Sequence, residues 1–176
     1  STNKDFKYQY PNVTAAGSWR TAVSLNTARR VLAGVGTYTA SLAFGGYNGT
    51  TQVATTELYN GTNWTSVNSL NGVKSALAGA GTATAALSFG GYAPPGNQAT
   101  TETWNGTNWT EVNDLNTARY TLGGTGTNTA ALAFGGQSDP PVQAVTELWN
   151  GTNWTEVNDL NTARQGGGSA GIYTAA

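Results

Sequence analysis

The chain has 176 residues, only 10% of them are charged, and its formal net charge is −1. This balance argues against a nucleic-acid partner, because binding to phosphates needs a basic surface. Histidine, cysteine and methionine are all absent, which removes imidazole, thiolate and disulfide chemistry. No apolar stretch approaches the ~20 residues of a membrane-spanning helix. We therefore expect neither nucleic-acid binding nor membrane insertion.

A fixed repeat of 45 residues organises the chain. The fifteen residues Asn105–Arg119 recur without change as Asn150–Arg164. The same spacing relates four tryptophans and three glycine pairs: Trp19, Trp64, Trp109 and Trp154, and the pairs at 45–46, 90–91 and 135–136. A period of this size is typical of repeat architectures. The 29 threonines, 24 glycines and 18 asparagines favour short strands joined by tight turns.

The N-terminal part corresponds to the second half of a repeat. Residues 6–25 would supply the two outer strands of a unit whose first two strands are missing. We divide the chain into an N-terminal strand or cap segment, 1–16, and a repeat region, 17–176. The repeats are assigned to 17–60, 61–105 and 106–150, followed by a partial copy at 151–176.

Each repeat predicts four antiparallel strands and no helix. In the third copy the expected strands are Arg119–Thr127, Thr129–Phe134, Ala144–Trp149 and Trp154–Leu160. The last two are joined by Asn150-Gly151, and Asn-Gly is the signature of a two-residue type I′ turn with positive φ at both positions. The same turn sequence stands at 60–63, 105–108 and 150–153, and we call these segments the NGTN turns.

Small four-stranded sheets cannot bury both faces alone, but stacking them around an axis can, which predicts an all-β propeller. The small residues at 77–81 and 122–124 suit the crowded innermost strands. The large aromatic residues of the third and fourth strands are expected to pack between neighbouring sheets. They are Tyr59, Trp104 and Trp149, and Trp64, Trp109 and Trp154.

The C-terminal residues 165–176 are expected to supply a first strand and the start of a second. The chain would then hold three full blades and two half-blades, whereas propellers normally need four or more blades to close. Three arrangements remain open. The chain can be part of a longer propeller, its two half-blades can form an imperfect fourth blade, or two chains can close one ring as an oligomer.

The repeat resembles the kelch repeat. The matching residues are LAFGG at 42–46, Tyr59, Trp64 and the basic position at 29, 74, 119 and 164. The wording TAALAFGG and GTNWTEV is also similar to kelch-like repeats of phage and bacterial surface proteins. The resemblance implies a β-propeller. Some kelch propellers are copper oxidases that use histidine, tyrosine and a Cys–Tyr crosslink, and a chain without His or Cys cannot carry that centre.

Two recurring patterns can each be interpreted in two ways. The recurring Glu and basic residues could be catalytic groups or ion pairs, and the recurring sequons could be glycosylation sites or turns. Glu57, Glu102 and Glu147 recur with Arg29, Lys74, Arg119 and Arg164, and we expect structural ion pairs. Paired catalytic carboxylates need different environments to separate their pKa values, and identical copies share one environment.

Eight Asn-X-Thr sequons occur, six of them in the NGTN turns, where turn formation explains them. We expect no catalytic residue, no metal and no cofactor.

The loops between the second and third strands differ in every copy, whereas the rest of the repeat is nearly copied. These variable loops are 47–52, 92–97 and 137–142. Loops on a rigid scaffold often carry function, so the candidate ligand-binding residues are Tyr47, Tyr92, Pro94, Pro95, Asp139 and Pro140. We expect a non-enzymatic structural or adhesion module of a virion or extracellular surface protein that binds host glycan or protein. The alternatives are an intracellular kelch adaptor for protein–protein interaction, or a non-catalytic part of a larger enzyme.

Overall fold

The computed structural model describes residues 22–169 and residue 171. This part of the chain contains three antiparallel four-stranded sheets, one short hairpin and no helix, which confirms the expected all-β class. Sheet I holds β1 (Ala33–Thr37), β2 (Ala40–Phe44), β3 (Thr56–Tyr59) and β4 (Trp64–Val67). Sheet II holds β5 (Ala78–Gly81), β6 (Ala86–Phe89), β9 (Thr101–Trp104) and β10 (Trp109–Val112). Sheet III holds β11 (Gly123–Gly126), β12 (Ala131–Phe134), β13 (Thr146–Trp149) and β14 (Trp154–Val157), and the hairpin pairs β7 (Tyr92–Ala93) with β8 (Gly96–Asn97).

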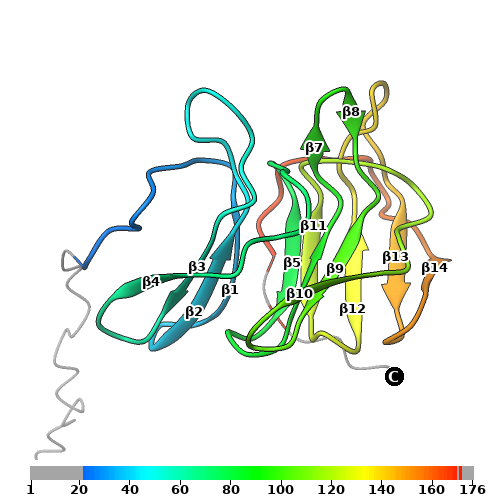
Figure 1. The fold of residues 1–176 in the computed structure, drawn as a ribbon. Coiled ribbons are helices and arrows are strands. Elements are labelled where there is room, and N and C mark those ends of the chain that lie inside the picture. Colours follow the sequence, from blue (N-terminus) through cyan, green and yellow to red (C-terminus); the bar gives the residue numbers. More distant parts are fainter. Residues whose placement is uncertain (1–21, 170, 172–176) are drawn as a thin grey trace, which may run out of the picture.

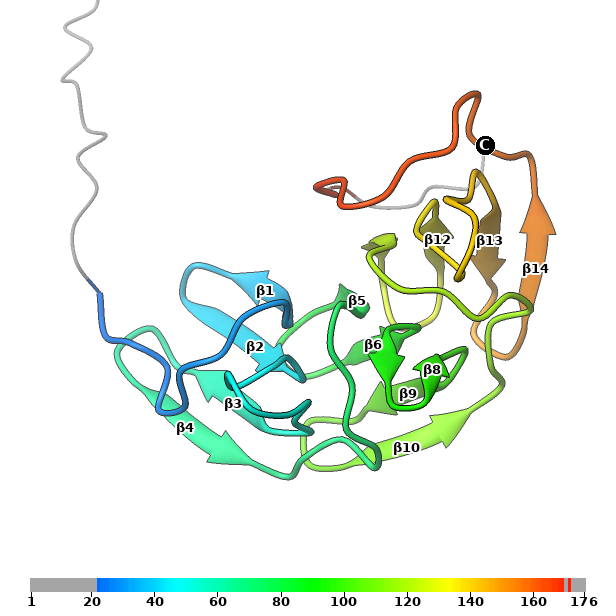
Figure 2. The same ribbon diagram turned by 90° about the horizontal axis from the view of Figure 1, so that it is seen from above.

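The three sheets stand side by side in an open arc (Figures 1 and 2). On the inner side of the arc β5 contacts both β1 and β11, and β4, β10 and β14 lie on the outer side (Figure 2). The described residues form no closed ring. The variable loops project from one edge of the sheets and the NGTN turns from the opposite edge (Figure 1).

The strands keep the same register in every sheet. A phenylalanine of the second strand lies opposite a threonine of the third strand, in the pairs Phe44–Thr56, Phe89–Thr101 and Phe134–Thr146. The first strands are shorter than expected, since β11 begins at Gly123 and not at Arg119. Thr121 has a φ of 51°, and this left-handed conformation interrupts the extended backbone before β11.

Backbone hydrogen bonds also link one sheet to the next through this left-handed position. The N–H of Ala76 donates to the Val31 carbonyl at 2.7 Å, and the N–H of Thr121 donates to the Ala76 carbonyl at 2.7 Å. Gly166 continues the series with a 2.9 Å bond to the Thr121 carbonyl. We call this series the backbone ladder. Within the described residues, the Val31 N–H and the Gly166 carbonyl have no hydrogen-bond partner.

The hairpin predicted at Asn150-Gly151 is confirmed, but the prediction of a type I′ turn within it is wrong. Four residues connect β13 to β14, and only Gly151, with a φ of 95°, has positive φ among them. The side-chain oxygen of Asn150 accepts hydrogen bonds from the N–H groups of Thr152 and Asn153, both at 2.9 Å. This side-chain turn supplies the reversal that the backbone conformation would otherwise have to provide. The first sequon asparagine of each NGTN turn therefore acts as a turn former, as expected. The side chains of Asn108 and Asn153, the second sequon asparagines, instead accept hydrogen bonds from asparagines of the preceding sheet.

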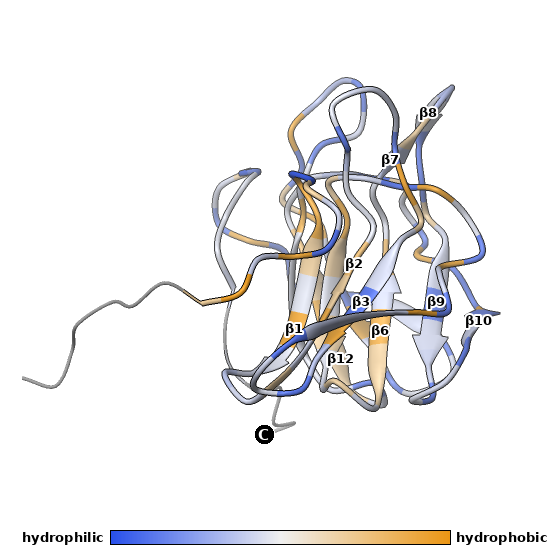
Figure 3. Cartoon of the chain, turned by 60° about the vertical axis from the view of Figure 1, so that its left-hand side comes forward, coloured by the Kyte–Doolittle hydropathy of each residue, from blue (hydrophilic) through white to orange (hydrophobic). Residues whose placement is uncertain are grey.

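The cores lie between neighbouring sheets. Phe44 of sheet I packs against Trp109 of sheet II, and Phe89 of sheet II against Trp154 of sheet III, each with ring centroids 4.9 Å apart. The indole N–H of Trp109 donates to Thr56 at 3.0 Å. Two clusters of buried apolar side chains surround these contacts. Figure 3 shows hydrophobic colour on β6 and β12 and hydrophilic colour in many of the loops.

The burial prediction for the aromatic residues is confirmed for four of them and wrong for two. Trp104, Trp109, Trp149 and Trp154 are buried, with exposed fractions of 1%, 5%, 2% and 5%. Trp64 and Tyr59 are only half-buried. Both belong to sheet I, which has a neighbouring sheet on one side only within the described residues. Trp109 and Trp154 are each covered by a phenylalanine of the preceding sheet, whereas no sheet precedes sheet I among the described residues to cover Trp64 in this way.

The predictions for the two termini have different outcomes. The N-terminal half-repeat and the cap segment fall largely on residues 1–21, which lie outside the described residues. At the C-terminus, residues 165–169 form no strand, which contradicts the expected first strand there. They still lie beside β11, because the Ser169 hydroxyl donates to the Gly124 carbonyl at 2.6 Å. The run Gly166–Gly168 offers no side chains that could pack against β11 and favour a regular extended form.

Candidate functional site

The three variable loops share one base and differ in their tips. Each begins at a Gly-Gly pair with positive φ, such as Gly45 at 67° and Gly46 at 110°. A Cβ on Gly46 would lie 2.9 Å from the Arg30 carbonyl oxygen, so only glycine fits this close approach. The base of the first loop is closed by the Val53 N–H, which donates to the Gly46 carbonyl at 2.9 Å. Equivalent bonds close the other two loops, so the scaffold presents three different tips from equivalent positions.

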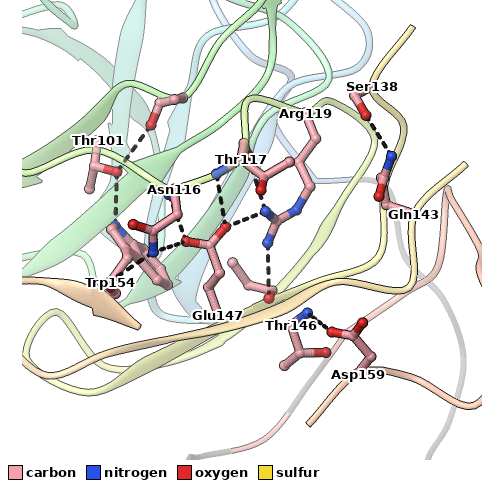
Figure 4. Close-up of polar contacts among 12 residues, drawn as sticks. Thr101, Asn116, Thr117, Arg119, Ser138, Gln143, Thr146, Glu147, Trp154 and Asp159 are labelled. Atoms are coloured by element: carbon pink, nitrogen blue, oxygen red, sulfur yellow. Dashed lines mark hydrogen bonds and ion pairs between the residues drawn. The ribbon is translucent and has the colours of Figure 1, made fainter. Parts of the chain in front are cut away.

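Each tip has its own internal hydrogen bonds. In the first loop, the side-chain oxygen of Asn48 accepts from the N–H groups of Thr50 and Thr51, both at 2.9 Å. The second loop is the β7–β8 hairpin, with Pro94 and Pro95 exposed between its strands. In the third loop Gln143 donates from its amide to the Ser138 hydroxyl at 2.6 Å (Figure 4). The tips are therefore held locally, and each presents a different surface.

The structure places the six predicted residues in two kinds of position. Tyr47 and Tyr92 lie at the feet of their loops and are half-buried. Pro94, Pro95, Asp139 and Pro140 are exposed at the tips of the second and third loops. The Asp139 carboxylate accepts a 3.4 Å hydrogen bond from Gln137 of its own loop. The six residues share one edge of the molecule, but they do not form one common cavity.

Two residues that the sequence did not single out complete the feet of the loops. The ring of Tyr120 meets the ring of Tyr92 edge to face, with centroids 5.9 Å apart. The guanidinium of Arg30 lies 5.2 Å from the centroid of the Tyr47 ring. Arg30, Ser75 and Tyr120 stand at the same position of the repeat. Each forms a backbone pair with the first residue of the variable loop of its sheet. This position differs in every copy, so its variation was the available signal.

Buried ion pairs lie beneath this edge, and they confirm the expected pairing of the recurring Glu and basic residues. Glu147 of β13 binds Arg119, with both side chains fully buried (Figure 4). Its carboxylate also accepts from the backbone and side-chain N–H groups of Asn116, at 2.7 and 2.9 Å. Arg119 and Asn116 belong to the crossover from sheet II to sheet III. We call each such ion pair and its crossover a latch; the others are Arg29–Glu57 and Lys74–Glu102.

Two groups in the latches have shifted pKa values. Burial acts to raise the pKa of Glu57, but hydrogen bonds from Arg29 and two backbone N–H groups outweigh burial and hold that pKa below its ordinary value. Burial lowers the pKa of the Lys74 ammonium, and nearby carboxylates, Glu102 first, oppose the shift only in part. Every latch carboxylate is already occupied by a cation and by N–H donors. This occupancy suits a structural role.

Two cavities are relevant to ligand binding. One of about 260 Å³ lies beside the inner strands and is lined mainly by glycine, including Gly34, Gly79 and Gly124. The other, of about 220 Å³, lies at the foot of the first variable loop. No group of three or more acidic side chains that could hold a metal ion occurs among the described residues. That part of the chain also has no helix long and apolar enough to cross a membrane.

Comparisons with known proteins do not assign the chain to a family. No protein-family model matches the chain, and no curated protein is similar to it at a significant level.

Proposed function

We propose that the chain is a non-enzymatic display and adhesion module that binds host glycan or protein through its variable loops. The observation that carries the proposal is the contrast between these loops and the rest of the repeat. Three different tips, with their adjoining residues, rise on one edge from nearly identical sheets (Figure 1). The opposite edge repeats the same NGTN turn. A binding face built on a rigid scaffold has this organisation.

The chemistry of the loop edge supports carbohydrate as the ligand class. Tyr92 and Tyr120 form an aromatic pair that combines an apolar ring surface with hydroxyl groups. The loops add threonine, asparagine and glutamine side chains, whose hydroxyls and amides can both donate and accept hydrogen bonds. A sugar ring needs this combination of apolar contact and neutral hydrogen bonding.

The scaffold belongs, in our proposal, to a kelch-like β-propeller of a virion or extracellular surface protein. The in-phase Gly-Gly pairs, the tryptophans packed between sheets and the open arc support a propeller segment. Further blades, from more chain or from another protein chain, would complete the ring. The partners would then be chains of a surface assembly and a host glycan.

Glycan-array binding of the labelled chain tests this function. We compare it with the double variant Tyr92→Ala/Tyr120→Ala and with Thr107→Ala, a matched control in the NGTN turn on the opposite edge. The control should bind like the original chain, whereas the double variant should lose at least about tenfold in affinity, equivalent to about 1.4 kcal/mol. Circular dichroism melting establishes that each variant is folded. Unchanged binding by a folded double variant, or no binding to any glycan or host cell, would refute the proposal.

A further inference from the structure

A shallow, open cavity lies at the foot of the first variable loop. It is lined by Ala28, Arg29, Arg30, Tyr47, Asn48 and Gly49. Arg30 and Tyr47 exchange two backbone hydrogen bonds, with N–O distances of 3.0 and 2.9 Å. The guanidinium of Arg30 lies over the Tyr47 ring, a cation–π contact that is only modestly stabilising at an exposed site. This contact favours a position of the Arg30 guanidinium beside the cavity.

The charge of Arg30 is uncompensated within the described residues. Three of the five basic side chains there are paired in latches, including Arg29 of this same cavity with Glu57. A fourth, Arg164, donates from Nε to the Thr162 carbonyl at 3.3 Å. Arg30 is exposed and has no carboxylate within ion-pair distance among the described residues. The cavity consequently carries about one net positive charge.

Asn48 adds a neutral donor to the same cavity. Its side-chain oxygen already accepts two hydrogen bonds, from the N–H groups of Thr50 and Thr51. An amide oxygen has two lone pairs, so this oxygen is fully used and the NH₂ group remains as the available polar end. The lining residues thus include one with a guanidinium and one with an amide donor and none with an acidic side chain, and most of the exposed lining surface is apolar.

We propose that this cavity binds the carboxylate of an acidic sugar, with Arg30 as its cation and Asn48 as its second donor. The inference rests on the proposed glycan-binding function and specifies the class of sugar. A guanidinium can bind a carboxylate through two parallel hydrogen bonds. One positive charge matches one carboxylate, whereas a phosphate carries about −1.5 to −2 at neutral pH. The concavity is shallow and open, with a volume of about 220 Å³, so it would contact one acidic residue of a longer glycan without enclosing it.

Sheets II and III cannot form the same subsite. The residues at the position of Arg30 are Ser75 and Tyr120, and neither carries a positive charge. The Tyr92–Tyr120 pair would contact neutral parts of the ligand. The loop edge therefore has an acid-specific subsite at one end and a neutral aromatic surface at the other, and the two can be tested separately.

The experiment titrates the chain with matched acidic and neutral saccharides, followed by NMR. The pairs are glucuronic acid with glucose, galacturonic acid with galactose, and sialyllactose with lactose. The variants are Arg30→Ala, Arg30→Lys and, for the aromatic surface, Tyr92→Ala/Tyr120→Ala. We expect an acidic saccharide to bind more tightly than its neutral partner, and Arg30→Ala to abolish this preference with at least a tenfold loss for the acid alone. Arg30→Lys should keep part of the preference, because lysine retains the positive charge but lacks the paired N–H donors with which a guanidinium binds a carboxylate.

Each outcome decides a different claim. If the chain binds saccharides but shows no acid preference, or keeps the preference in Arg30→Ala, the acid subsite is wrong and the glycan-binding function stands. If it binds no saccharide at all, the glycan-binding function itself is wrong. An N-acetyl-aspartyl peptide serves as a further probe. Equal binding of that peptide and of the acidic sugars would overturn the assignment to carbohydrate.

Discussion

The joint between sheets I and II and the joint between sheets II and III share their aromatic and asparagine contacts, but their buried polar residues differ. Each has a Phe–Trp contact at 4.9 Å with rings inclined by 60°, and a Trp–Thr hydrogen bond of 3.0 or 3.1 Å. Each also has a bridge between asparagine side chains, at 2.8 or 2.7 Å. One difference is in the latch, where the first joint has Lys74 and the second has Arg119.

The comparison separates what sets the geometry of a joint from what tunes it. The aromatic contacts agree closely although the buried cation differs, so apolar packing sets the spacing of the sheets. The cation changes the polar contacts. Arg119 reaches Glu147 and also the carbonyls of Thr117 and Ala133, whereas Lys74 reaches Glu102 at 3.2 Å and Thr100 only at 3.4 Å. Among the described residues, each joint also contains a buried polar atom without a hydrogen-bond partner, the Ser88 hydroxyl in the lysine joint and Arg119 Nε in the arginine joint.

The largest expected effect is loss of a joint tryptophan. Trp109→Ala and Trp154→Ala should each lower the free energy of unfolding by about 3–5 kcal/mol, because each removes a buried ring from an equivalent core. Trp64→Ala is the matched control, and its loss should be smaller because Trp64 is half-buried. Urea denaturation followed by fluorescence and circular dichroism measures all three. Equal losses at Trp64 and Trp109 would contradict packing between sheets as the source of stability.

Removing the latch carboxylate should distinguish the two joints. Glu147→Ala leaves the guanidinium of Arg119 buried and unpaired, which should cost about 3–5 kcal/mol. Glu102→Ala should cost less, because lysine can lose its proton when buried and arginine cannot. Denaturant unfolding at pH 7 and at pH 9 tests this, with the exposed Glu156→Ala as the control, expected within about 0.5 kcal/mol. If the cost of Glu102→Ala fails to decrease at pH 9, the explanation is wrong.

Exchanging the cations should have an intermediate effect. Arg119→Lys loses the hydrogen bond to the Ala133 carbonyl and should cost about 1.5–3 kcal/mol, the usual contribution of a bond from a charged group. Lys74→Arg should be neutral or stabilising, since the backbone of sheet II offers the corresponding carbonyl at Ser88. Differential scanning calorimetry of both variants measures the asymmetry. Destabilisation by Lys74→Arg as large as by Arg119→Lys would show that the two joints differ in shape as well.

The smallest expected effect is a dependence of stability on pH that belongs to one joint. The folded pKa of Lys74 lies below its unfolded value of about 10.4, so between these values the unfolded state binds more protons and stability rises with pH. Lys74→Arg should remove this alkaline rise.

At acidic pH, a separate effect is expected from Glu57 in the latch of sheet I. The folded pKa of Glu57 is lowered, so its contribution to stability is present above about pH 4.3 and is lost as the pH falls through the folded value. Unfolding measured across pH 3–10 checks both signs.

Much of the fold could be predicted because it depends on repeated local signals. The spacing of Trp109 and Trp154 and the Gly-Gly pairs locates the strands and the packing between sheets. The NGTN turns were mispredicted because the asparagine side chain competes with the backbone for the turn hydrogen bonds, and Asn-Gly alone does not show which wins. The candidate site was predicted in part. Tyr47 and Tyr92 were found through loop variation, but Arg30 and Tyr120 lie outside the loops and are brought to them by the fold, through cross-strand pairing and side-chain contacts.

The backbone ladder gives the arc a direction. Every bond in it runs the same way, from the N–H of Gly166 through Thr121 and Ala76 to the carbonyl of Val31. Among the described residues, one end therefore offers a donor and the other an acceptor, and two like ends cannot satisfy each other. A neighbour that extends this ladder has to join head to tail. Symmetric face-to-face pairing through like ends is disfavoured, and repeated head-to-tail joining leads either to a ring or to an open filament.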